Sequence, residues 1–372
     1  MSNKSTICLS MIVKNEAHCI TKCLESVKPI INHWVISDTG STDNTEEVIK
    51  EFLKDIPGEY IHNEWKDFST NRNIALDLAK QKAEYVFIID ADDSLIIEDK
   101  GICQYDILTH PSYNLKIKHG SITYHRPLLI KSSTPCKFIG ILHEYLDLAD
   151  TPATLCGSYI HFGANGNRSK SPDKYKKDAE TFVKALETDP NNSRYLFYCA
   201  QSFRDANDLP KALEYYQKRA EIPGWIEENY IALFEIAKIY EEIDPDKVEI
   251  AYLKAHNLMP TRAEALCYLA KFYRKRNEFE KGYFYALCAR NIFKPGKALF
   301  LEDACYSWIP LDEMAVCGYY IGKRKWAEIV NEQLIKDPDV PEYQKVRLKD
   351  NLAICQEKNK DGFINRRGIE SH

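Results

Sequence analysis

The pattern of apolar and polar residues follows the strand period in some segments and the helix period in others. In the first part of the chain, segments of the two kinds alternate. Four apolar runs predict strands, and the amphipathic segments between them predict helices. The predicted strands are 7–13, 33–37, 60–63 and 85–90, and the predicted helices are 17–26, 44–54 and 68–82. The run 85–90 (YVFIID) is apolar up to its final residue, which is typical of a central strand. Strands alternating with helices over short connections predict a parallel sheet with helices on both faces.

After residue 93 the pattern changes to shorter strands of hairpin type, around 114–117, 121–130 and 144–148, with another at 159–162. The segment 165–173 (NGNRSKSPD) is polar and contains Gly and Pro, as domain boundaries often are. The sequence therefore predicts an N-terminal domain over residues 1–170 and a second domain over 171–372.

The second domain has few strand signals and a repeating helical pattern. Ala200, Ala237 and Ala270 are separated by 37 and 33 residues, and each has a Leu four residues before it. Ala212 and Gly282 follow the first and third Ala by twelve residues, where two helices of a hairpin need a small contact residue. This spacing resembles the tetratricopeptide repeat, which has about 34 residues per helix pair. A degenerate fourth unit is expected over 311–338, and an ordinary helical bundle is the alternative.

Composition excludes several classes of protein. The chain of 372 residues has 50 Lys and Arg against 55 Asp and Glu, so it lacks the excess of basic charge that a nucleic-acid-binding surface requires. No window approaches the ~20 apolar residues of a membrane helix, and the run 7–13 is too short for a signal peptide. A cytoplasmic protein without a membrane span or a nucleic-acid partner is expected.

The twelve cysteines favour a structural role for reduced thiols. Several stand singly in apolar stretches, where a thiol behaves as a small buried hydrophobe; these are Cys8, Cys103, Cys156, Cys199, Cys267, Cys288 and Cys317. His18, Cys19 and Cys23 are close together, but no second Cys/His pair follows at zinc-finger spacing.

Polar residues follow three of the predicted strands. The strings are VKNE at 13–16, DTGSTDNT at 38–45 and DADD at 90–93. Ligands of open parallel sheets bind beyond the carboxyl ends of the strands, so these strings are expected to line one crevice. On an extended strand Asp90 and Asp92 would point to the same side and could share one Mg²⁺ or Mn²⁺ ion. The alternative is a cluster that caps a following helix.

The turn after Asp38 is small and polar, so that a ligand can approach the backbone at Gly40. An ordinary turn and helix cap is the alternative. The segment after the first strand reads VKNEAH, which lacks the G-x-G-x-x-G of dinucleotide-binding folds and the phosphate-cradling P-loop.

The strings SMIVKNEAHCITKCLESV, VISDTGSTDNTEEVI, WKDFSTNRNIAL and FIIDADD together resemble glycosyltransferase family 2. The chain is most similar to the cytosolic subgroup with tetratricopeptide-like repeats after the catalytic domain. The resemblance implies an α/β fold, namely the Rossmann-like nucleotide-sugar-binding A-type fold with a mixed, mostly parallel sheet, followed by an all-α repeat domain. It also implies a metal-dependent, inverting transfer from a UDP-sugar, with Mn²⁺ or Mg²⁺ as cofactor.

The same resemblance assigns roles to residues of this chain. Those implied to bind the donor nucleotide are Val13, Asn15, Glu16, Asp38, Gly40, Arg72, Asp90 and Ala91. Those implied to ligate the metal are Asp90, Asp92 and His161, although a core histidine is the alternative for His161. Arg168 and Lys174 are candidates to fold over the phosphates, with solvated linker charges as the alternative.

Glu144 is the candidate catalytic base. It lies in FIGILHE, which is similar to the family's G-x-x-H-E segment, and inverting transfer needs a carboxylate to take the acceptor's proton. A surface carboxylate at a strand edge is the alternative. The Gln-x-x-Arg-Trp signature of processive members is missing, which excludes a synthase of the cellulose or hyaluronan type.

The acceptor is expected to be a polypeptide or a glycan, because repeat arrays form surfaces suited to extended ligands. Trp225, Glu227, Glu228 and Tyr230 are candidates to line such a groove, with core packing as the alternative. The repeats also offer a surface for homo-oligomerisation. A binding scaffold with an inactive transferase-like domain is the alternative function.

Overall fold

The computed structural model of the chain describes residues 4–98, 101–119, 122–163, 166, 172–296 and 298–367. It divides into two compact units, Met1–Asp178 and Ala179–His372. The division falls within helix α4 (Lys174–Thr188), whereas the sequence places the boundary after residue 170. Within the described helices, none combines the length and the apolar character that crossing a membrane requires.

The N-terminal unit is built on an eight-stranded sheet in the order β3-β2-β1-β4-β7-β6-β10-β5. Its strands are β1 (Ile7–Val13), β2 (His33–Asp38), β3 (Gly58–His62), β4 (Tyr85–Ile88), β5 (Ser94–Ile97), β6 (Ser112–His119), β7 (Ile122–Lys131) and β10 (Ala153–His161). Four of the seven strand pairings are parallel, including those of β1 with β2 and β4. A second sheet pairs β8 (Cys136–Ile139) with β9 (Tyr145–Leu148).

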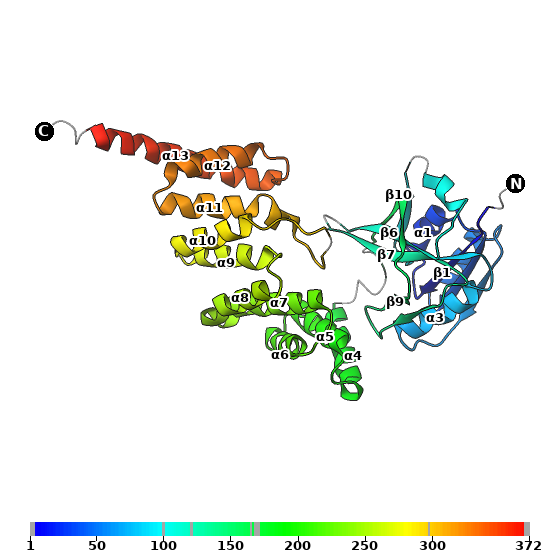
Figure 1. Cartoon of the computed structure of the whole chain (residues 1–372). Helices are drawn as coiled ribbons and strands as arrows, with labels where there is room; N and C mark the ends of the chain where they lie inside the picture. The colour runs from blue at the N-terminus through cyan, green and yellow to red at the C-terminus, as the bar shows by residue number, and fades with distance from the viewer. Residues whose placement is uncertain are drawn as a thin grey trace. The chain divides into compact units, whose positions relative to one another are not determined.

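Helices cover both faces of the parallel part of this sheet, as predicted (Figure 1). They are α1 (Ile20–Val27), α2 (Thr45–Phe52) and α3 (Phe68–Ala79), with a short 3-10 helix η1 (Gly101–Tyr105) later in the chain. Alternate residues of β1, such as Ile7 and Leu9, pack with Leu24 of α1. Cys8 points to the opposite face and packs with Leu76 of α3. The strand periodicity of two thus separates the core into two layers of packing.

The strands β5 and β8 were not predicted, and several strand boundaries differ from the prediction; two of these boundaries bear on the site. β4 ends at Ile88, and the residues after it form a turn in which the Asp93 backbone N–H donates to the Asp90 carbonyl oxygen at 3.1 Å. Asp90 and Asp92 therefore do not alternate along an extended strand, which corrects the reasoning that paired them. β9 begins at Tyr145, so Glu144 belongs to the loop before it.

The C-terminal unit is a stack of helices in chain order (Figure 1). After α4 they are α5 (Ser193–Asp205), α6 (Leu209–Glu221), α7 (Ile226–Ile243), α8 (Val248–Leu258), α9 (Glu264–Lys275), α10 (Phe279–Arg290), α11 (Ile309–Tyr320), α12 (Arg324–Lys336) and α13 (Glu342–Arg367). The 3-10 helix η3 (Pro245–Lys247) occupies the shortened turn between α7 and α8, and η4 (Asp303–Tyr306) precedes α11. The helix pairs α5–α6, α7–α8, α9–α10 and α11–α12 confirm the predicted repeats, including the degenerate fourth unit.

Small residues mark the helix contacts, as the spacing predicts. Ala200, Ala237 and Ala270 are completely buried. A Cβ at Gly282 would lie 2.7 Å from the Cys317 sulfur and 3.2 Å from the Ala270 carbonyl oxygen, so only glycine fits between these helices.

Of the four candidates for a groove around Trp225, two follow the alternative of core packing. Tyr230 is completely buried, and Glu228 is buried in ion pairs with Arg219 and Arg194 at 3.3 and 3.4 Å. Trp225, in contrast to Tyr230, is exposed. The helical periodicity of α7 places Glu228 and Tyr230 on its buried side, where an aromatic ring contributes buried area.

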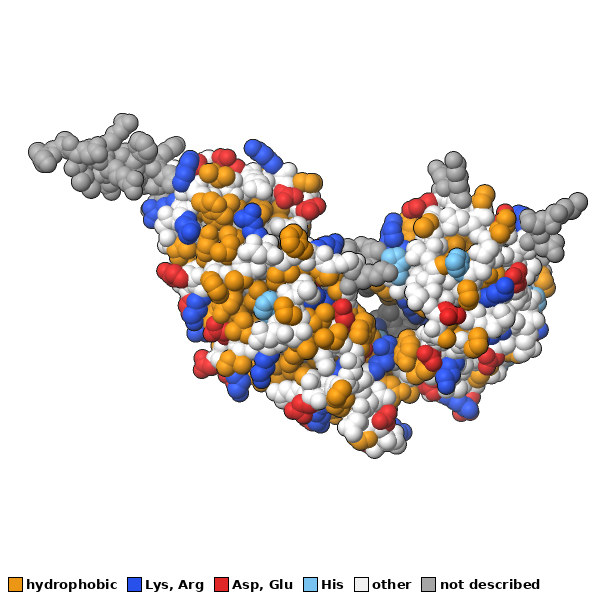
Figure 2. Space-filling model, in the orientation of Figure 1, with side chains coloured by type: hydrophobic (Ala, Val, Ile, Leu, Met, Phe, Trp, Pro, Cys, Tyr) orange, Lys and Arg blue, Asp and Glu red, His pale blue; other side chains and the backbone are white. Residues whose placement is uncertain are grey.

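Apolar side chains also reach the surface of the C-terminal unit, and they gather on the face that Figure 2 shows. Exposed examples in this unit include Ile250 of α8, Phe284 of α10 and Tyr343 of α13. Two cysteines of the N-terminal unit, Cys103 and Cys156, are exposed, contrary to the expectation from their apolar neighbours. Nothing in the local sequence distinguishes these two positions from the buried thiols.

Candidate active site

The loop between β2 and α2 is built around the side chain of Asp38. Its Oδ1 accepts hydrogen bonds from the backbone N–H groups of Gly40 and Ser41 at 3.0 and 2.8 Å, and from the Ser41 hydroxyl at 2.9 Å. Its Oδ2 accepts from the Tyr60 hydroxyl at 2.8 Å. Gly40 has a φ of +104°, a conformation that favours glycine. The protein's own donors thus satisfy this buried carboxylate and fix the loop.

The turn between β1 and α1 is fastened to that loop. Asn15 has a φ of +58°, and its N–H donates to the Ser41 hydroxyl oxygen at 2.9 Å while its Oδ1 accepts from the Thr42 N–H at 2.7 Å. The Glu16 N–H donates to the Thr45 hydroxyl oxygen at 2.9 Å. The structure therefore brings together the two polar strings that the sequence placed at one crevice.

The ends of the neighbouring strands complete this edge. The Val13 carbonyl oxygen accepts a hydrogen bond from the Thr39 N–H at 3.0 Å, which extends the β1–β2 ladder into the loops. Ala91 is buried in the turn after β4, with 5% of its surface exposed. Val13 contributes to this edge of the sheet through its backbone carbonyl group.

Arg72 joins two acids that are far apart in the sequence. From α3 its Nε donates to Glu144 Oε1 at 2.6 Å and its Nη2 donates to Asp90 Oδ1 at 2.5 Å, while its guanidinium lies 5.7 Å from the centre of the Phe138 ring. The Arg72 side chain is buried. Burial lowers the pKa of the guanidinium, but the charges of Asp90 and Glu144 raise that pKa above its ordinary value. Arg72 is therefore a charged bridge with both ends of its fork occupied.

The acids after β4 differ in how their charges are compensated. Burial raises the pKa of Asp90, but the charges of Arg72 and Arg126 outweigh it and hold that pKa below its usual value. Asp92 accepts from the Gly166 N–H at 2.9 Å, and burial together with the charge of Asp90 leaves its pKa raised. Burial and Asp90 also raise the pKa of Asp93 to about 7.

This excess of buried negative charge fits a divalent cation. Hard cations prefer carboxylate oxygens, and Asp92 has no positively charged partner among the described residues at ion-pair distance. The backbone wraps closely around Asp92, because a Cβ at Gly163 would lie 1.8 Å from the Asp92 carbonyl oxygen. Asp92 and the partly exposed Asp90 are therefore the residues that could hold the cation.

Glu144 occupies a strained loop between β8 and β9. Gly140 and His143 on that loop have φ values of +110° and +50°. The loop is attached to α3, because the Phe138 N–H donates to Asn73 Oδ1 at 2.7 Å. The Glu144 side chain is 8% exposed, so it is not a surface carboxylate at a strand edge. Arg72 engages Oε1, and among the described residues no hydrogen bond occupies Oε2.

His161 lies at the end of a strand beside the acid cluster but makes no ion pair with it among the described residues. It is the exposed last residue of β10, in register with Ser94 of β5. Within the described ranges no ion pair connects it with Asp90 or Asp92, and its exposure also excludes a core histidine. Its role as a metal ligand stays a prediction. Lys174 is the first residue of α4, and Arg168 lies outside the described residues.

Two contributors were missed by the sequence analysis. Arg126 of β7 places Nη1 4.0 Å from Asp90 Oδ2, and Tyr60 of β3 donates to Asp38. Arg126 reaches Asp90 because β7 pairs antiparallel with β4. No local pattern encodes that pairing. The alternation of β3 predicts which face of the sheet Tyr60 lies on, but it does not predict that the Tyr60 hydroxyl contacts Asp38.

Comparison with known proteins finds a family match within the N-terminal unit. Residues 8–101 match the model of Glycosyl transferase family 2. This part of the chain, about a quarter of its length, is therefore similar to that family. The sheet order and the helix pairs confirm the predicted architecture, an α/β unit with a mixed, mostly parallel sheet followed by tetratricopeptide-like helix pairs.

Curated relatives cover both parts of the chain. The SPbeta prophage-derived glycosyltransferase SunS of Bacillus subtilis (strain 168) is 26% identical over 245 residues, which are 58% of this chain and 54% of SunS. A TPR repeat-containing protein of Synechococcus elongatus is 29% identical over 148 residues, 38% of this chain and 35% of that protein. The chain thus spans about half the length, or less, of the curated relatives it matches.

Solved structures show similarity at low TM-scores. The crystal structure of S. aureus TarS 1–349 in complex with UDP-GlcNAc has a TM-score of 0.33 and 15% identity, and covers 69% of this chain and 90% of that one. A tetratricopeptide repeat protein from Parabacteroides merdae has a TM-score of 0.39 and 18% identity, and covers 54% of this chain and 74% of that one.

Proposed function

We propose that this protein is a metal-dependent, inverting glycosyltransferase that transfers a sugar from a UDP-sugar to a polypeptide or glycan acceptor. The Arg72 bridge is the observation on which this proposal rests. It holds a carboxylate suited to take a proton, Glu144, beside the acid cluster suited to a cation and a diphosphate. The similarity of residues 8–101 to Glycosyl transferase family 2 supports the class of reaction.

Glu144 is proposed as the general base. Its Oε2 accepts the proton of the acceptor's nucleophile as that atom bonds to the anomeric carbon and the bond from this carbon to the UDP oxygen breaks. Arg72 holds Oε1 and so fixes the direction in which Oε2 points. Arg72 is thereby proposed to position the base, with both ends of its fork committed to the protein's own acids.

Asp92, with Asp90, is proposed to hold Mn²⁺ or Mg²⁺. When bound, such an ion supplies the positive charge that stabilises a diphosphate leaving group. Asn15, Glu16 and Gly40 line the neighbouring loops and are proposed to contact the nucleotide. Asp38 is proposed to act by shaping the loop, because its oxygens already accept four hydrogen bonds.

A polar acceptor, polypeptide or glycan, is supported by a cavity of about 160 Å³ in the C-terminal unit. Its lining combines charged and aromatic side chains of the helices α5, α7 and α9 and of the segments before α9 and after α10; among these are Arg204, Phe234, Glu235, Arg262, Phe300 and Glu302. Charged groups of both signs next to rings suit a polar ligand better than a purely apolar one.

The test is release of UDP from a panel of UDP-sugars by the full chain, with and without Mn²⁺, alongside Glu144→Gln. We expect metal-stimulated release that the substitution reduces strongly. The scaffold alternative expects no release with any donor and no effect of UDP with Mn²⁺ on the thermal midpoint. Equal release by the variant and the wild type would remove Glu144 from the mechanism.

A further inference from the structure

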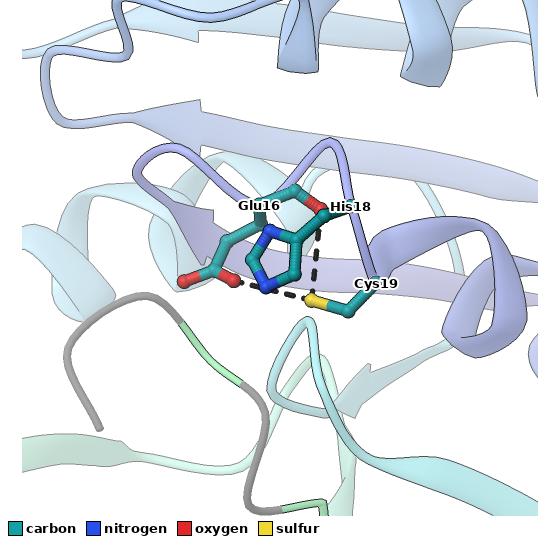
Figure 3. A group of neighbouring side chains, drawn as sticks. All are labelled: Glu16, His18 and Cys19. Carbon is teal, nitrogen blue, oxygen red and sulfur yellow. Dashed lines mark hydrogen bonds between the residues drawn. The ribbon is translucent and has the colours of Figure 1, made fainter. Parts of the chain in front are cut away.

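Three different metal-ligand types converge on the turn between β1 and α1. The ligand atoms of Glu16, His18 and Cys19 all lie within 4.8 Å of one another (Figure 3). We propose that Glu16, His18 and Cys19 form a binding site for Zn²⁺. This site is distinct in ligand chemistry from the acid cluster after β4.

The backbone of this turn is held in place before any ion binds. Consecutive N–H groups of Asn15, Glu16 and Ala17 donate to side chains of the β2–α2 loop, the last of them to Asp43 Oδ2 at 3.3 Å. The Cys19 N–H then donates to the Glu16 carbonyl oxygen at 3.0 Å. Preorganisation of this kind reduces the ordering cost of binding, since the three side chains project from a fixed backbone.

The existing contacts match the coordination that zinc prefers. The Cys19 thiol donates to Glu16 Oε2 at 3.2 Å, a hydrogen bond between two groups that would both become ligands. Zinc binds thiolate sulfur at about 2.3 Å and imidazole nitrogen at about 2.0 Å, so neighbouring ligand atoms end roughly 3.5 Å apart. The three groups therefore need to approach by about 1 Å, and the thiol proton passes to solvent as the sulfur–metal bond forms.

Ligand softness separates this site from the one proposed at Asp90 and Asp92. A sulfur, an imidazole and one carboxylate favour Zn²⁺, whereas a set made only of carboxylates favours Mg²⁺ or Mn²⁺. Glu16 is also proposed to contact the donor, so bound Zn²⁺ competes with the UDP-sugar. That consequence rests on the proposed function, and the metal site itself does not.

Cobalt(II) titration of the full chain tests the site, because thiolate coordination gives a charge-transfer absorption that carboxylate sites lack. We expect one equivalent of Co²⁺ to produce this absorption and Zn²⁺ to remove it. Cys19→Ser abolishes the absorption and His18→Gln weakens Co²⁺ affinity at least ~10-fold. Cys103→Ser, which removes an exposed thiol elsewhere in the unit, leaves both unchanged.

The proposal is overturned if the wild type gives no thiolate absorption with excess Co²⁺, or if the absorption survives in Cys19→Ser. His18 is exposed, so His18→Gln keeps the test decisive should the Cys19 variant fold poorly. Unchanged Co²⁺ affinity in His18→Gln also overturns it. A second titration, of UDP against the Zn²⁺-loaded chain, separates the two proposals: unweakened UDP binding with the absorption intact refutes only the donor role of Glu16.

Discussion

Replacing Arg72 with methionine removes the charge that two acids share and keeps most of the apolar contact of the side chain. Glu144 then loses its partner while its side chain stays 8% exposed, and Asp90 loses the nearer of its two arginines at 34% exposure. The variant is expected to be markedly less stable, because an uncompensated carboxylate remains in the interior.

The magnitude follows from the burial of each acid. Removing one partner of a buried pair costs about 3–5 kcal/mol, and the Glu144 arm belongs to that class. The Asp90 arm is more than one-third exposed, so solvent screening limits it to about 1 kcal/mol or less. Because the two arms share one guanidinium and do not add fully, we expect a loss of about 3 kcal/mol. In a unit of this size that lowers the thermal midpoint by roughly 6–12 °C.

The loss is also expected to depend on pH. The folded-state pKa of Asp90 lies below its ordinary value of 3.8, so its pairing stabilises the fold above that pH. This contribution disappears as the pH falls through the lowered pKa. The difference between the wild type and Arg72→Met is therefore expected to stay constant from pH 7 down to the ordinary pKa of 3.8 and to shrink as the pH falls further, through the lowered pKa of Asp90.

Calorimetry in buffer with EDTA measures the difference, and hydrogen exchange of α3 assigns it to the N-terminal unit. Arg126→Met is the matched control, since its Nη1 is 4.0 Å from Asp90 and 34% of its side chain is exposed. It should cost less than about 1 kcal/mol. A loss of ~3 kcal/mol predicts a clearly lower thermal midpoint for Arg72→Met. A midpoint within about 2 °C of the wild type would show that the two ion pairs do not stabilise the fold.

Three further outcomes are expected. Glu144→Gln should keep the affinity for UDP-sugar while turnover falls by ~10²-fold or more, and Asp147→Asn, an exposed carboxylate on β9, should leave turnover unchanged; equal effects would refute the base. Asp92→Asn should abolish the gain in UDP affinity that Mn²⁺ gives in calorimetry, and a retained gain would exclude Asp92 as a ligand. Gly282→Ala should destabilise the chain by about 1–3 kcal/mol in urea unfolding through overpacking. Gly318→Ala, whose new Cβ would have its nearest neighbours at 3.5 Å, should be neutral or stabilising; the opposite order would contradict the helix packing.

Much of the fold could be predicted because its strands and helices follow from the local periodicity of apolar residues. The strand β1 is apolar except for Ser10, as expected of a strand covered on both faces, and the structure buries it on both faces. The helix pairs were visible in the spacing of Ala200, Ala237 and Ala270, since a close helix contact admits only small residues. The meeting of the β1–α1 and β2–α2 loops followed from parallel strands ending at one edge.

The rest depends on contacts between residues that are distant in the sequence. Arg72 and Glu144 are 72 residues apart, and a resemblance of motifs gives each a role without showing that they bind each other. The turn after Ile88 was missed because Ile89 is as apolar as the strand before it, so burial masked the end of the strand. The sequence left the place of Tyr230 open between a groove and the core, because an aromatic residue suits both, and the structure buries it.

The four acids at the carboxyl edge of the sheet show where a ligand's charge is needed. Protein hydrogen-bond donors satisfy Asp38, and Arg72 compensates Asp90, so neither requires a further partner for stability. Asp92 and Asp93 receive backbone hydrogen bonds only, and their raised pKa values express the free energy that ionisation in this place costs. A cation that binds Asp92 would stabilise its ionised carboxylate, and this stabilisation contributes to the affinity for the cation. A cation that binds Asp90 would have to displace an arginine. The proposed metal is therefore expected to depend more on Asp92 than on Asp90.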